Sequence, residues 1–350
     1  MSPPQNVRRS NGKPKVVSIS YPSWAGKEYL EAFEKEFELH WIEPSDRAGT
    51  VAALKAKVES DGPFEAIAIL MGTGPYEPFD EEMLKPLLPQ CKILVSASAG
   101  YDDYDVEWMT KNNILFCNSR KAVDESTADL AVFLTLGILR DYSRLHISMR
   151  EGRWRGGLAP VRDPAGLTLG IIGMGAIGKH VARKAKVFNM KIVYFQRNQL
   201  PDDMERSLDA TYCGTLSELF RVSDVVSVNC PLNQNTRGMI GREQLSMMKD
   251  GSFLVNTARG AIIDEPALIE ALESGKIARA GMDVFVGEPR PNKYFLESDR
   301  VMIQPHMGGI TDMAWQKAYR EALENMRSFF ATGKAISPIN AERLESASTT

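Results

Sequence analysis

Short apolar runs alternate with amphipathic segments along most of the chain. In the first third, the apolar runs cover residues 16–20, 37–42, 66–70, 92–98 and 114–118. Helix-like segments lie between them at residues 27–36, 51–60 and 104–112. Continuous apolar runs of strand length, separated by helices, are typical of a parallel sheet that helices cover on both faces.

A second alternating series follows in the other half of the chain. Its apolar runs cover residues 167–173, 191–195, 225–230, 252–257, 278–285 and 301–305. Between the two series, DEST supplies a helix start at Asp124, and the pattern predicts one long helix that continues to Met149. An amphipathic helix is predicted at residues 311–331. We therefore predict two open parallel sheets in tandem, with the boundary near residues 119–124, and periodicity does not assign the last helix to either sheet.

Composition adds the class of protein. The 350 residues are 43% hydrophobic and 25% charged, with a formal net charge of −3, which is ordinary for a globular enzyme or binding protein. The slightly acidic balance argues against binding to nucleic acid or to a membrane surface, and we expect no metal site. The longest apolar run, residues 130–139, is too short to span a membrane.

The location of the protein is predicted from its N-terminus and its cysteines. The first fifteen residues are polar and mildly basic and contain no apolar segment, so we expect a disordered tail and no secretory signal. No two cysteines form a Cys-x-x-Cys pair, and we predict that they are reduced packing residues of a cytoplasmic protein. The cysteines are Cys91, Cys117, Cys213 and Cys230.

A glycine-rich turn is the first candidate for chemistry. Gly173-x-Gly175-x-x-Gly178 follows an apolar strand and opens a helix. Gly173 would permit the tight turn, Gly175 would let the backbone approach a diphosphate, and Gly178 would let the helix pack on the strand. The helix N-terminus would then direct free N–H groups at the diphosphate. The pattern indicates a dinucleotide site, although a plain strand–helix turn remains an alternative.

The strand end that should select the cofactor carries no acid. An Asp or Glu about twenty residues after the glycine turn normally binds the adenosine ribose. The corresponding segment here is KIVYFQRNQL, where Gln196 and Arg197 follow the strand. A neutral Gln196 would not repel a 2′-phosphate, and Arg197 could pair with it. We therefore predict NADP(H) as the favoured cofactor, with NAD(H) possible if Arg197 is only a solvated turn residue.

Three further polar residues follow predicted strands. Arg259 follows FLVNTA, Glu288 follows DVF closely, and His306 follows VMIQP. Ligands of open α/β sheets bind beyond the carboxyl ends of the strands. Arg can hold a carboxylate bidentately, and His can deliver a proton near neutral pH while a Glu orients its ring.

The chain resembles the D-isomer-specific 2-hydroxyacid dehydrogenase family. The resemblance covers most of the chain, in the family's order and spacing, and is closest to the glyoxylate/hydroxypyruvate reductase branch because of the strand end YFQRN. GRWRGG and the tail beyond residue 330 also suit that branch. The segments that carry it are SASAGYDDYD (96–105), AVDESTADLAVFLTLGILR (122–140), the glycine turn, NCPLNQNTRGMI (229–240), LVNTARG (254–260), GMDVFVGEP (281–289) and QPHMGG (304–309).

The resemblance implies an α/β architecture of two open parallel-sheet domains with an active-site cleft between them. A flavodoxin-like substrate-binding domain would comprise residues 1–121 and 306–350, which assigns the last helix. A Rossmann cofactor domain would comprise residues 122–305. The family also implies a homodimer, formed through the region 124–150.

The resemblance further implies residue roles in the reduction of a small 2-oxo acid to the D-2-hydroxy acid. Arg259 would bind the substrate carboxylate together with the N–H groups of Ala99 and Gly100. His306 would be the general acid and base, and Glu288 would hold it protonated. Asp283 would meet the nicotinamide carboxamide. The remaining cofactor-binding residues would be Thr127, Gly173, Met174, Gly175, Ala176, Ile177, Gly178, Gln196, Arg197, Asn198, Cys230, Pro231, Thr236, Thr257, Ala258 and His306.

Two alternatives and one departure stay open. The substrate could be bulkier, as in the D-mandelate dehydrogenases of the family, with Trp24, Tyr76, Met307 and Trp315 as candidate pocket walls. A dinucleotide-sensing protein of co-repressor type is the other alternative, which the short tails disfavour. Where the family commonly has a Thr-Pro-Gly type turn, residues 119–121 are Ser-Arg-Lys, which would loosen the turn at a hinge and add surface charge.

Overall fold

The computed structural model describes residues 12–70, 74, 76–155 and 159–347, with the backbone alone at 345–347. Most of the predicted N-terminal tail, the last two residues of GRWRGG and the last three residues of the chain lie outside this range. By its internal contacts the chain divides into two units, residues 1–123 with 312–350 and residues 124–311. None of the helices in the described ranges is long and apolar enough to cross a membrane.

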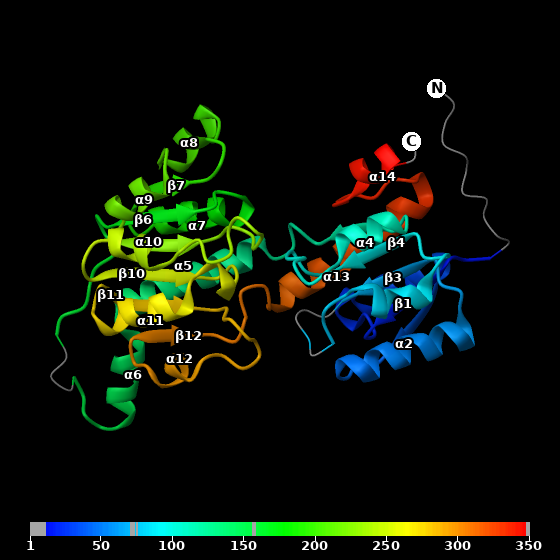
Figure 1. The fold of residues 1–350 in the computed structure, drawn as a ribbon, viewed down its shortest axis with the longest axis horizontal. Coiled ribbons are helices and arrows are strands. Elements are labelled where there is room, and N and C mark those ends of the chain that lie inside the picture. The colour runs from blue at the N-terminus through cyan, green and yellow to red at the C-terminus, as the bar shows by residue number, and fades with distance from the viewer. Residues whose placement is uncertain (1–11, 71–73, 75, 156–158, 348–350) are drawn as a thin grey trace. The chain divides into compact units, whose positions relative to one another are not determined.

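The first unit contains a five-stranded parallel sheet in the order β2-β1-β3-β4-β5 (Figure 1). Its strands are β1 (Lys15–Ile19), β2 (Glu38–Ile42), β3 (Ala66–Ile69), β4 (Ile93–Ser96) and β5 (Leu115–Asn118). Its α-helices are α1 (Lys27–Glu36), α2 (Arg47–Asp61), α3 (Glu81–Leu84), α4 (Val106–Lys111), α13 (Asp312–Thr332) and α14 (Ala341–Ala347). Two single turns of 3₁₀ helix are η1 (Ser23–Ala25) and η2 (Lys85–Leu87).

Alternate residues of these strands face opposite layers of helices. Val16 packs in a cluster with Phe33 of α1 and Leu323 of α13. Its neighbour Val17 packs in another cluster with Leu54 of α2 and other residues. Because side chains alternate across a strand, each apolar run supplies both layers. The last long helix, α13, therefore covers this sheet, an assignment that periodicity left open.

The second unit contains a seven-stranded parallel sheet in the order β12-β11-β10-β9-β6-β7-β8 (Figure 1). Its strands are β6 (Thr168–Ile172), β7 (Lys191–Phe195), β8 (Ala210–Tyr212), β9 (Val225–Val228), β10 (Ser252–Asn256), β11 (Ile277–Met282) and β12 (Val301–Ile303). Its helices are α5 (Asp124–Leu139), α6 (Tyr142–Arg150), α7 (Ala176–Lys186), α8 (Asp202–Leu208), α9 (Leu216–Val222), α10 (Arg242–Met247), η3 (Gly260–Ile262), α11 (Glu265–Glu273) and α12 (Lys293–Glu297).

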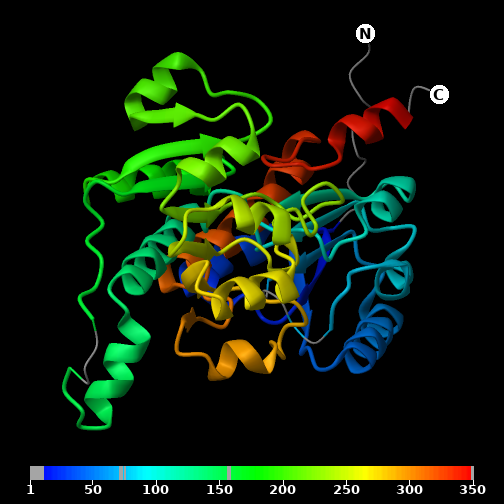
Figure 2. The same cartoon turned by 60° about the vertical axis from the view of Figure 1, so that its left-hand side comes forward.

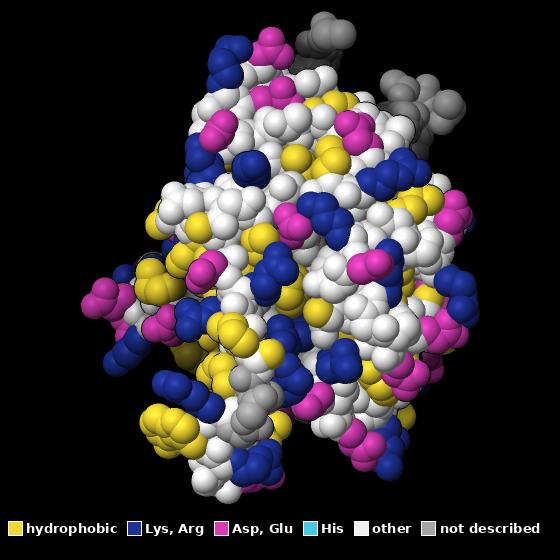
Figure 3. All heavy atoms as spheres, turned by 90° about the vertical axis from the view of Figure 1, so that its left-hand side faces the viewer, with side chains coloured by type: hydrophobic (Ala, Val, Ile, Leu, Met, Phe, Trp, Pro, Cys, Tyr) yellow, Lys and Arg dark blue, Asp and Glu magenta, His cyan; other side chains and the backbone are white. Residues whose placement is uncertain are grey.

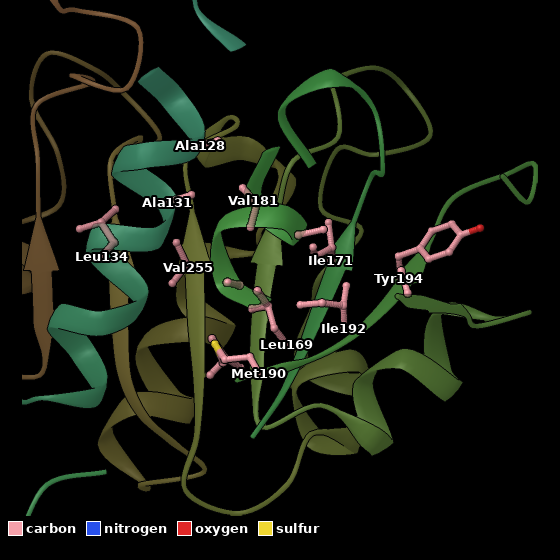
Figure 4. Packing of buried hydrophobic residues seen from close by; sticks show 14 of the residues in the cluster. Ala128, Ala131, Leu134, Leu169, Ile171, Val181, Met190, Ile192, Tyr194 and Val255 are labelled. Atoms are coloured by element: carbon pink, nitrogen blue, oxygen red, sulfur yellow. The ribbon is translucent and has the colours of Figure 1, made fainter. Parts of the chain in front are cut away.

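Helices cover both faces of this sheet as well. On one face Ala131 and Leu134 of α5 and Val181 of α7 pack with Val255 and Ile171 of the strands (Figure 4). On the other face, α9, α10, α11 and α12 contribute to a second cluster. The prediction of two open parallel sheets is confirmed.

The predicted single helix from Asp124 to Met149 is wrong. The chain leaves the helix after Leu139, and Asp141 takes a left-handed conformation with φ 54°. Figure 2 shows α6 as a segment separate from α5. Asp141 is buried, and its carboxylate accepts hydrogen bonds from Arg144 Nε and Arg279 Nε, both 2.8 Å long. The partner on β11 is distant in sequence, so helical periodicity gave no sign of this break.

Candidate active site and cofactor site

The glycine turn joins β6 to α7 and needs its glycines for steric reasons. Gly173 has φ +94°, and a Cβ there would lie 2.9 Å from the backbone of Asn229 and Cys230. A Cβ on Gly178 would lie 2.2 Å from the carbonyl oxygen of Gly173. Any larger residue at either position would collide with backbone, so these two glycines bring α7, β6 and the end of β9 together.

The space around the turn fits a dinucleotide. A Cβ on Gly175 would meet no atom within 4 Å, and the α7 N-terminus has no side-chain cap. Its free N–H groups and the positive end of the helix dipole favour a phosphate there. Asn229 Oδ1 and Thr257 Oγ1, just beyond β9 and β10, are buried without a hydrogen-bond partner among the described residues. Both are polar atoms that a ligand at these strand ends would satisfy.

The position of the turn in the sheet agrees with this assignment. β6 lies between β7 and β9, so the strand order reverses direction there. Met174, Ala176 and Ile177 lie in the turn and the first helical residues. In open α/β sheets, ligands bind beyond the strand ends at such a switch point.

The end of β7 presents a cation. Gln196 Nε2 donates to the carbonyl oxygen of Asn198 at 2.7 Å, and Tyr212 donates to the carbonyl oxygen of Gln196 at 3.1 Å. These bonds close the turn around Arg197, which is exposed and has no ion pair with any described residue. The guanidinium is therefore available to an anionic ligand.

The other predicted cofactor residues lie at the ends of β9 and α5. The hydroxyl of Thr236 donates to the carbonyl oxygen of Pro231 at 2.7 Å and closes the loop after β9. Burial raises the pKa of Cys230 to about 11, so its side chain stays a thiol. Thr127 is buried in the first turn of α5, and a Cβ on Gly308 would lie 3.2 Å from its Cγ2.

Arg259 stands on a turn that Asn256 braces. The Asn256 side chain donates to the carbonyl oxygen of Arg259 at 2.9 Å and accepts from the N–H of Ala258 at 3.0 Å. Asn256 is fully buried at the end of β10. Arg259 is half-buried, and its Nη1 donates to the carbonyl oxygen of Ala258 at 2.8 Å. Sequence reasoning missed Asn256, although a polar residue ending an apolar strand was a visible signal.

Glu288 and His306 form a hydrogen-bonded pair. His306 Nδ1 lies 2.8 Å from Glu288 Oε2, and the N–H of Phe285 donates to Glu288 Oε1 at 2.7 Å. Burial disfavours the carboxylate, but the His306 contact, the Phe285 N–H and the charge of Arg259 together lower the pKa of Glu288. The two side chains are 26% and 27% exposed, for His306 and Glu288 respectively, so the pair is reachable from solvent.

Asp283 holds the turn that carries His306. Its Oδ1 accepts from the N–H of Met307 at 2.7 Å and its Oδ2 from the N–H of Gly308 at 2.9 Å. Its carbonyl oxygen accepts from the N–H of His306, which has φ 56°. Burial raises the pKa of Asp283 although the two N–H groups oppose the rise. The predicted contact of Asp283 with a nicotinamide stays a prediction beside this observed role.

In the first unit, Ala99 and Gly100 lie in the turn after β4. Neither N–H donates a hydrogen bond to a described residue.

Of the candidate pocket walls, Tyr76 is 2% exposed and belongs to the core. Trp24 is 43% exposed, and its ring centroid lies 5.3 Å from that of Trp315.

At the departure from the family pattern, Ser119 is buried and its hydroxyl contacts the carbonyl oxygens of Ser96 and Ala318. Arg120 and Lys121 are exposed. Ser119 therefore ties β4 to α13, and the two cations lie on the surface.

Comparison with known proteins identifies relatives of this chain. Residues 132–308 match the family described as D-isomer specific 2-hydroxyacid dehydrogenase, NAD binding domain. Dehydrogenase efuE of Hormonema carpetanum is 56% identical over 93% of this chain and 82% of its own length. The 4-methyl-2-oxopentanoate reductase A of Aspergillus oryzae is 41% identical over 76% of this chain and 80% of its own.

Solved structures of similar fold carry names of the same kind. A glyoxylate reductase from Paecilomyes thermophila superposes with a TM-score of 0.84 and 36% identity, over 94% of this chain and 99% of its own. The holo form of Rhodotorula graminis D-mandelate dehydrogenase superposes with a TM-score of 0.84 and 32% identity, over 93% of this chain and 97% of its own. An NADPH-dependent glyoxylate/hydroxypyruvate reductase from Sinorhizobium meliloti, in complex with NADP and malonate, gives 0.80 and 28%, over 95% and 98%.

Proposed function

This chain belongs to the D-isomer-specific 2-hydroxyacid dehydrogenase family, and we propose that it reduces a small 2-oxo acid of the glyoxylate or hydroxypyruvate type to the D-2-hydroxy acid. It is an oxidoreductase that uses a nicotinamide dinucleotide. The observation that carries the proposal is the His306–Glu288 pair. Arg259, Glu288 and His306 follow β10, β11 and β12, which are neighbours in the sheet that holds the glycine turn.

Each residue has a proposed part in the reaction. Bound NAD(P)H supplies the hydride that adds to C2 of the 2-oxo acid. Arg259 binds the substrate carboxylate and polarises the carbonyl oxygen. Because Glu288 occupies Nδ1 of His306, Nε2 is the nitrogen that gives a proton to the forming alkoxide. In the oxidation direction, the same nitrogen takes the proton back.

Glu288 stabilises the imidazolium form of His306 as a charge-assisted hydrogen-bond acceptor. Its lowered pKa keeps it ionised through the neutral range. The N–H groups of Ala99 and Gly100 bind the substrate carboxylate together with Arg259. These interactions strengthen as charge develops on the substrate oxygen, which is where they accelerate the reaction.

NADP(H) is the proposed cofactor in preference to NAD(H). The support is the exposed Arg197 beside the neutral Gln196, since a 2′-phosphate needs a cation and tolerates no carboxylate there. A similar structure contains NADP. Gly173, Gly175 and Gly178 would hold the diphosphate, and Asn229 and Thr257 would meet polar groups of the cofactor.

Initial rates test both parts of the proposal. Glyoxylate and hydroxypyruvate would each be assayed with NADPH and with NADH at equal concentration. We expect turnover of both acids and a higher kcat/KM with NADPH. An NADH preference would reject the role of Arg197, and turnover of neither acid would reject the proposed substrate class.

A bulkier 2-oxo acid is the second candidate. Trp24 and Trp315 form an aromatic pair with Trp24 43% exposed, and aromatic walls suit large apolar substituents. The relatives include a 4-methyl-2-oxopentanoate reductase and a D-mandelate dehydrogenase. Rates with 4-methyl-2-oxopentanoate and phenylglyoxylate decide between the two, because a higher kcat/KM than with glyoxylate would favour this candidate.

A homodimer formed through residues 124–150 and a cytoplasmic location remain proposals. Support for the dimer comes from exposed hydrophobic side chains in and after α5 and α6, which are Phe133, Tyr142, Ile147, Met149 and Trp154. The surface in Figure 3 shows hydrophobic side chains interspersed with Lys and Arg and with Asp and Glu. Sedimentation of the purified protein at several concentrations tests the dimer, and a monomer at micromolar concentration would reject it.

A further inference from the structure

Two side chains and one backbone N–H of the first unit hold the carbonyl oxygens of the turn after β4. Asn118 Nδ2 donates to the carbonyl oxygen of Ala99 at 2.6 Å. Ser98 Oγ donates to that of Gly100 at 2.8 Å. The N–H of Ser119 donates to that of Ser98 at 3.0 Å. Three successive carbonyl oxygens of the turn therefore accept hydrogen bonds from within this unit.

Tyr104, Ser96 and Ser98 form a chain of hydrogen-bonded hydroxyl groups that ends at the carbonyl oxygen of Gly100. The direction of donation along this chain is determined. Ser98 Oγ lies 2.8 Å from Ser96 Oγ, which lies 2.9 Å from the Tyr104 hydroxyl. A carbonyl oxygen can only accept, and each hydroxyl has one hydrogen. The Ser98 hydroxyl therefore donates its hydrogen to the carbonyl oxygen of Gly100. Ser96 must then donate to Ser98, and Tyr104 must donate to Ser96. Burial raises the pKa of Tyr104, which keeps its hydroxyl protonated.

The N–H groups of Ala99 and Gly100 in the turn have no such partners in the part of the chain that the structure describes. Both residues are half-buried. Because the carbonyl oxygens are occupied, N–H groups are the backbone polar groups that the turn has left to offer a ligand. Consecutive free N–H groups of this kind suit an anion.

We propose that Asn118 and Ser98 are positioning residues that hold the turn so that its N–H groups bind the carboxylate of the 2-oxo acid. This inference rests on the proposed function and adds residues that act through Ala99 and Gly100. A role limited to the stability of the sheet is the competing explanation. Asn118 is 1% exposed and its Oδ1 has no partner among the described residues, so its observed side-chain bond is the one to the turn.

The chain offers a matched control. Asn340 is also 1% exposed. Its side chain accepts from the N–H of Phe116 in β5 at 2.8 Å and donates to the carbonyl oxygen of Ile114, just before β5, at 3.0 Å. It makes no hydrogen bond to the turn. Asn340 lies just before α14, so Asn340→Ala removes a buried amide that binds the same sheet and leaves the proposed carboxylate site intact.

The experiment compares an acid with its neutral ester. For Asn118→Ala, we expect kcat/KM with glyoxylate to fall about threefold to tenfold, mainly through KM, the range for one positioning hydrogen bond. We expect kcat/KM with methyl glyoxylate and the Kd for NADPH to change less than about twofold. Asn340→Ala should lower the melting temperature and leave the ratio of acid to ester unchanged. Equal losses with acid and ester in Asn118→Ala would overturn the proposal.

A second pair of variants decides the matter if Asn118→Ala does not fold. Ser98→Ala should reproduce the selective loss with glyoxylate, and Ser98→Thr, which keeps the hydroxyl, should restore the parent value to within about twofold. No selective loss in Ser98→Ala would overturn the proposal.

Calorimetric binding of malonate to the NADPH-loaded protein separates this inference from the proposed substrate. A parent protein that binds malonate but reduces no glyoxylate would refute the substrate class alone. In that case the inference stands if Ser98→Ala weakens malonate binding and falls if it does not.

Discussion

The turns at the carboxyl ends of the two sheets are built from different chemical groups. The turn after β4 in the five-stranded sheet is held by neutral hydroxyl and amide groups, and its Ala99 and Gly100 N–H groups donate to no described residue. The turns after β10, β11 and β12 in the seven-stranded sheet carry an arginine, two carboxylates and an imidazole. The first turn can bind a charge, whereas the second set can also exchange a proton.

This difference explains why the ionisable residues of the candidate site, which are Arg259, Asp283, Glu288 and His306, lie in one unit. A general acid needs a partner that stabilises its charged form, and both must share a rigid frame. Glu288 and His306, the proposed pair, are hydrogen-bonded within one unit. Free N–H groups keep the same charge at every pH, so a turn that only binds needs no titrating partner.

The largest effect is expected for His306→Gln. Glutamine keeps a polar side chain but cannot deliver a proton, so kcat should fall at least about a hundredfold while the Kd for NADPH changes little. His40 pairs with Glu38 at 2.8 Å in the first unit and is the matched control. Steady-state rates of His306→Gln and His40→Gln measure the contrast, and equal rates in the two variants would remove His306 as the proton donor.

Arg259→Ala is expected to be the next largest. Loss of the guanidinium removes a carboxylate ligand and a transition-state cation, so KM for glyoxylate should rise and kcat fall, with kcat/KM down roughly a hundredfold or more. Arg242, which pairs with Glu270 on the surface, supplies the control variant Arg242→Ala. A parent-like dependence of rate on glyoxylate in Arg259→Ala would contradict the role in carboxylate binding.

Arg197→Ala should have a smaller and selective effect. If the exposed guanidinium binds a 2′-phosphate, KM for NADPH should rise about tenfold and KM for NADH should stay within about twofold. Kinetics with both cofactors measure this, with Arg290→Ala as an exposed control. Parallel changes for NADPH and NADH would show that Arg197 does not select the cofactor.

The smallest effect is expected on how the free energy of unfolding depends on pH. The folded-state pKa of Glu288 is lowered, so the unfolded chain binds its proton first as pH falls. Its stabilising contribution is therefore complete above the ordinary carboxyl pKa of about 4.3 and is lost as pH falls through the lower folded value. Glu288→Gln should flatten the decline of the unfolding free energy in that window. Urea titrations from about pH 3 to pH 7 measure it.

The ionisation of Asp283 is expected to change the unfolding free energy with pH in the direction opposite to that of Glu288. Its folded-state pKa is raised, so its ionisation costs stability as pH rises from the ordinary carboxyl value through the folded one. Glu243 is exposed, and Glu243→Gln is the control variant for both carboxylates.

If the unfolding free energy of Glu288→Gln and of Glu243→Gln had the same slope against pH as that of the parent, the lowered pKa of Glu288 would be wrong.

The alternation of apolar runs predicted both sheets, because buried parallel strands must be apolar on both faces whatever their neighbours are. The glycine turn and the polar residues after the strands were visible for a similar reason. A turn that needs φ > 0 or close backbone approach requires Gly, as Gly173 and Gly178 do. Arg259, Glu288 and His306 stood out because each follows an apolar run directly or within a few residues.

The tertiary structure decided what depends on partners distant in sequence. The break at Asp141 needs Arg279 of β11, and the Asp283 carboxylate binds N–H groups more than twenty residues away. Asn118 at the end of β5 likewise donates to the carbonyl oxygen of Ala99, which follows the neighbouring strand β4. Local patterns report burial and backbone conformation, whereas a hydrogen bond between distant segments requires that the sheet has already brought its strand ends together.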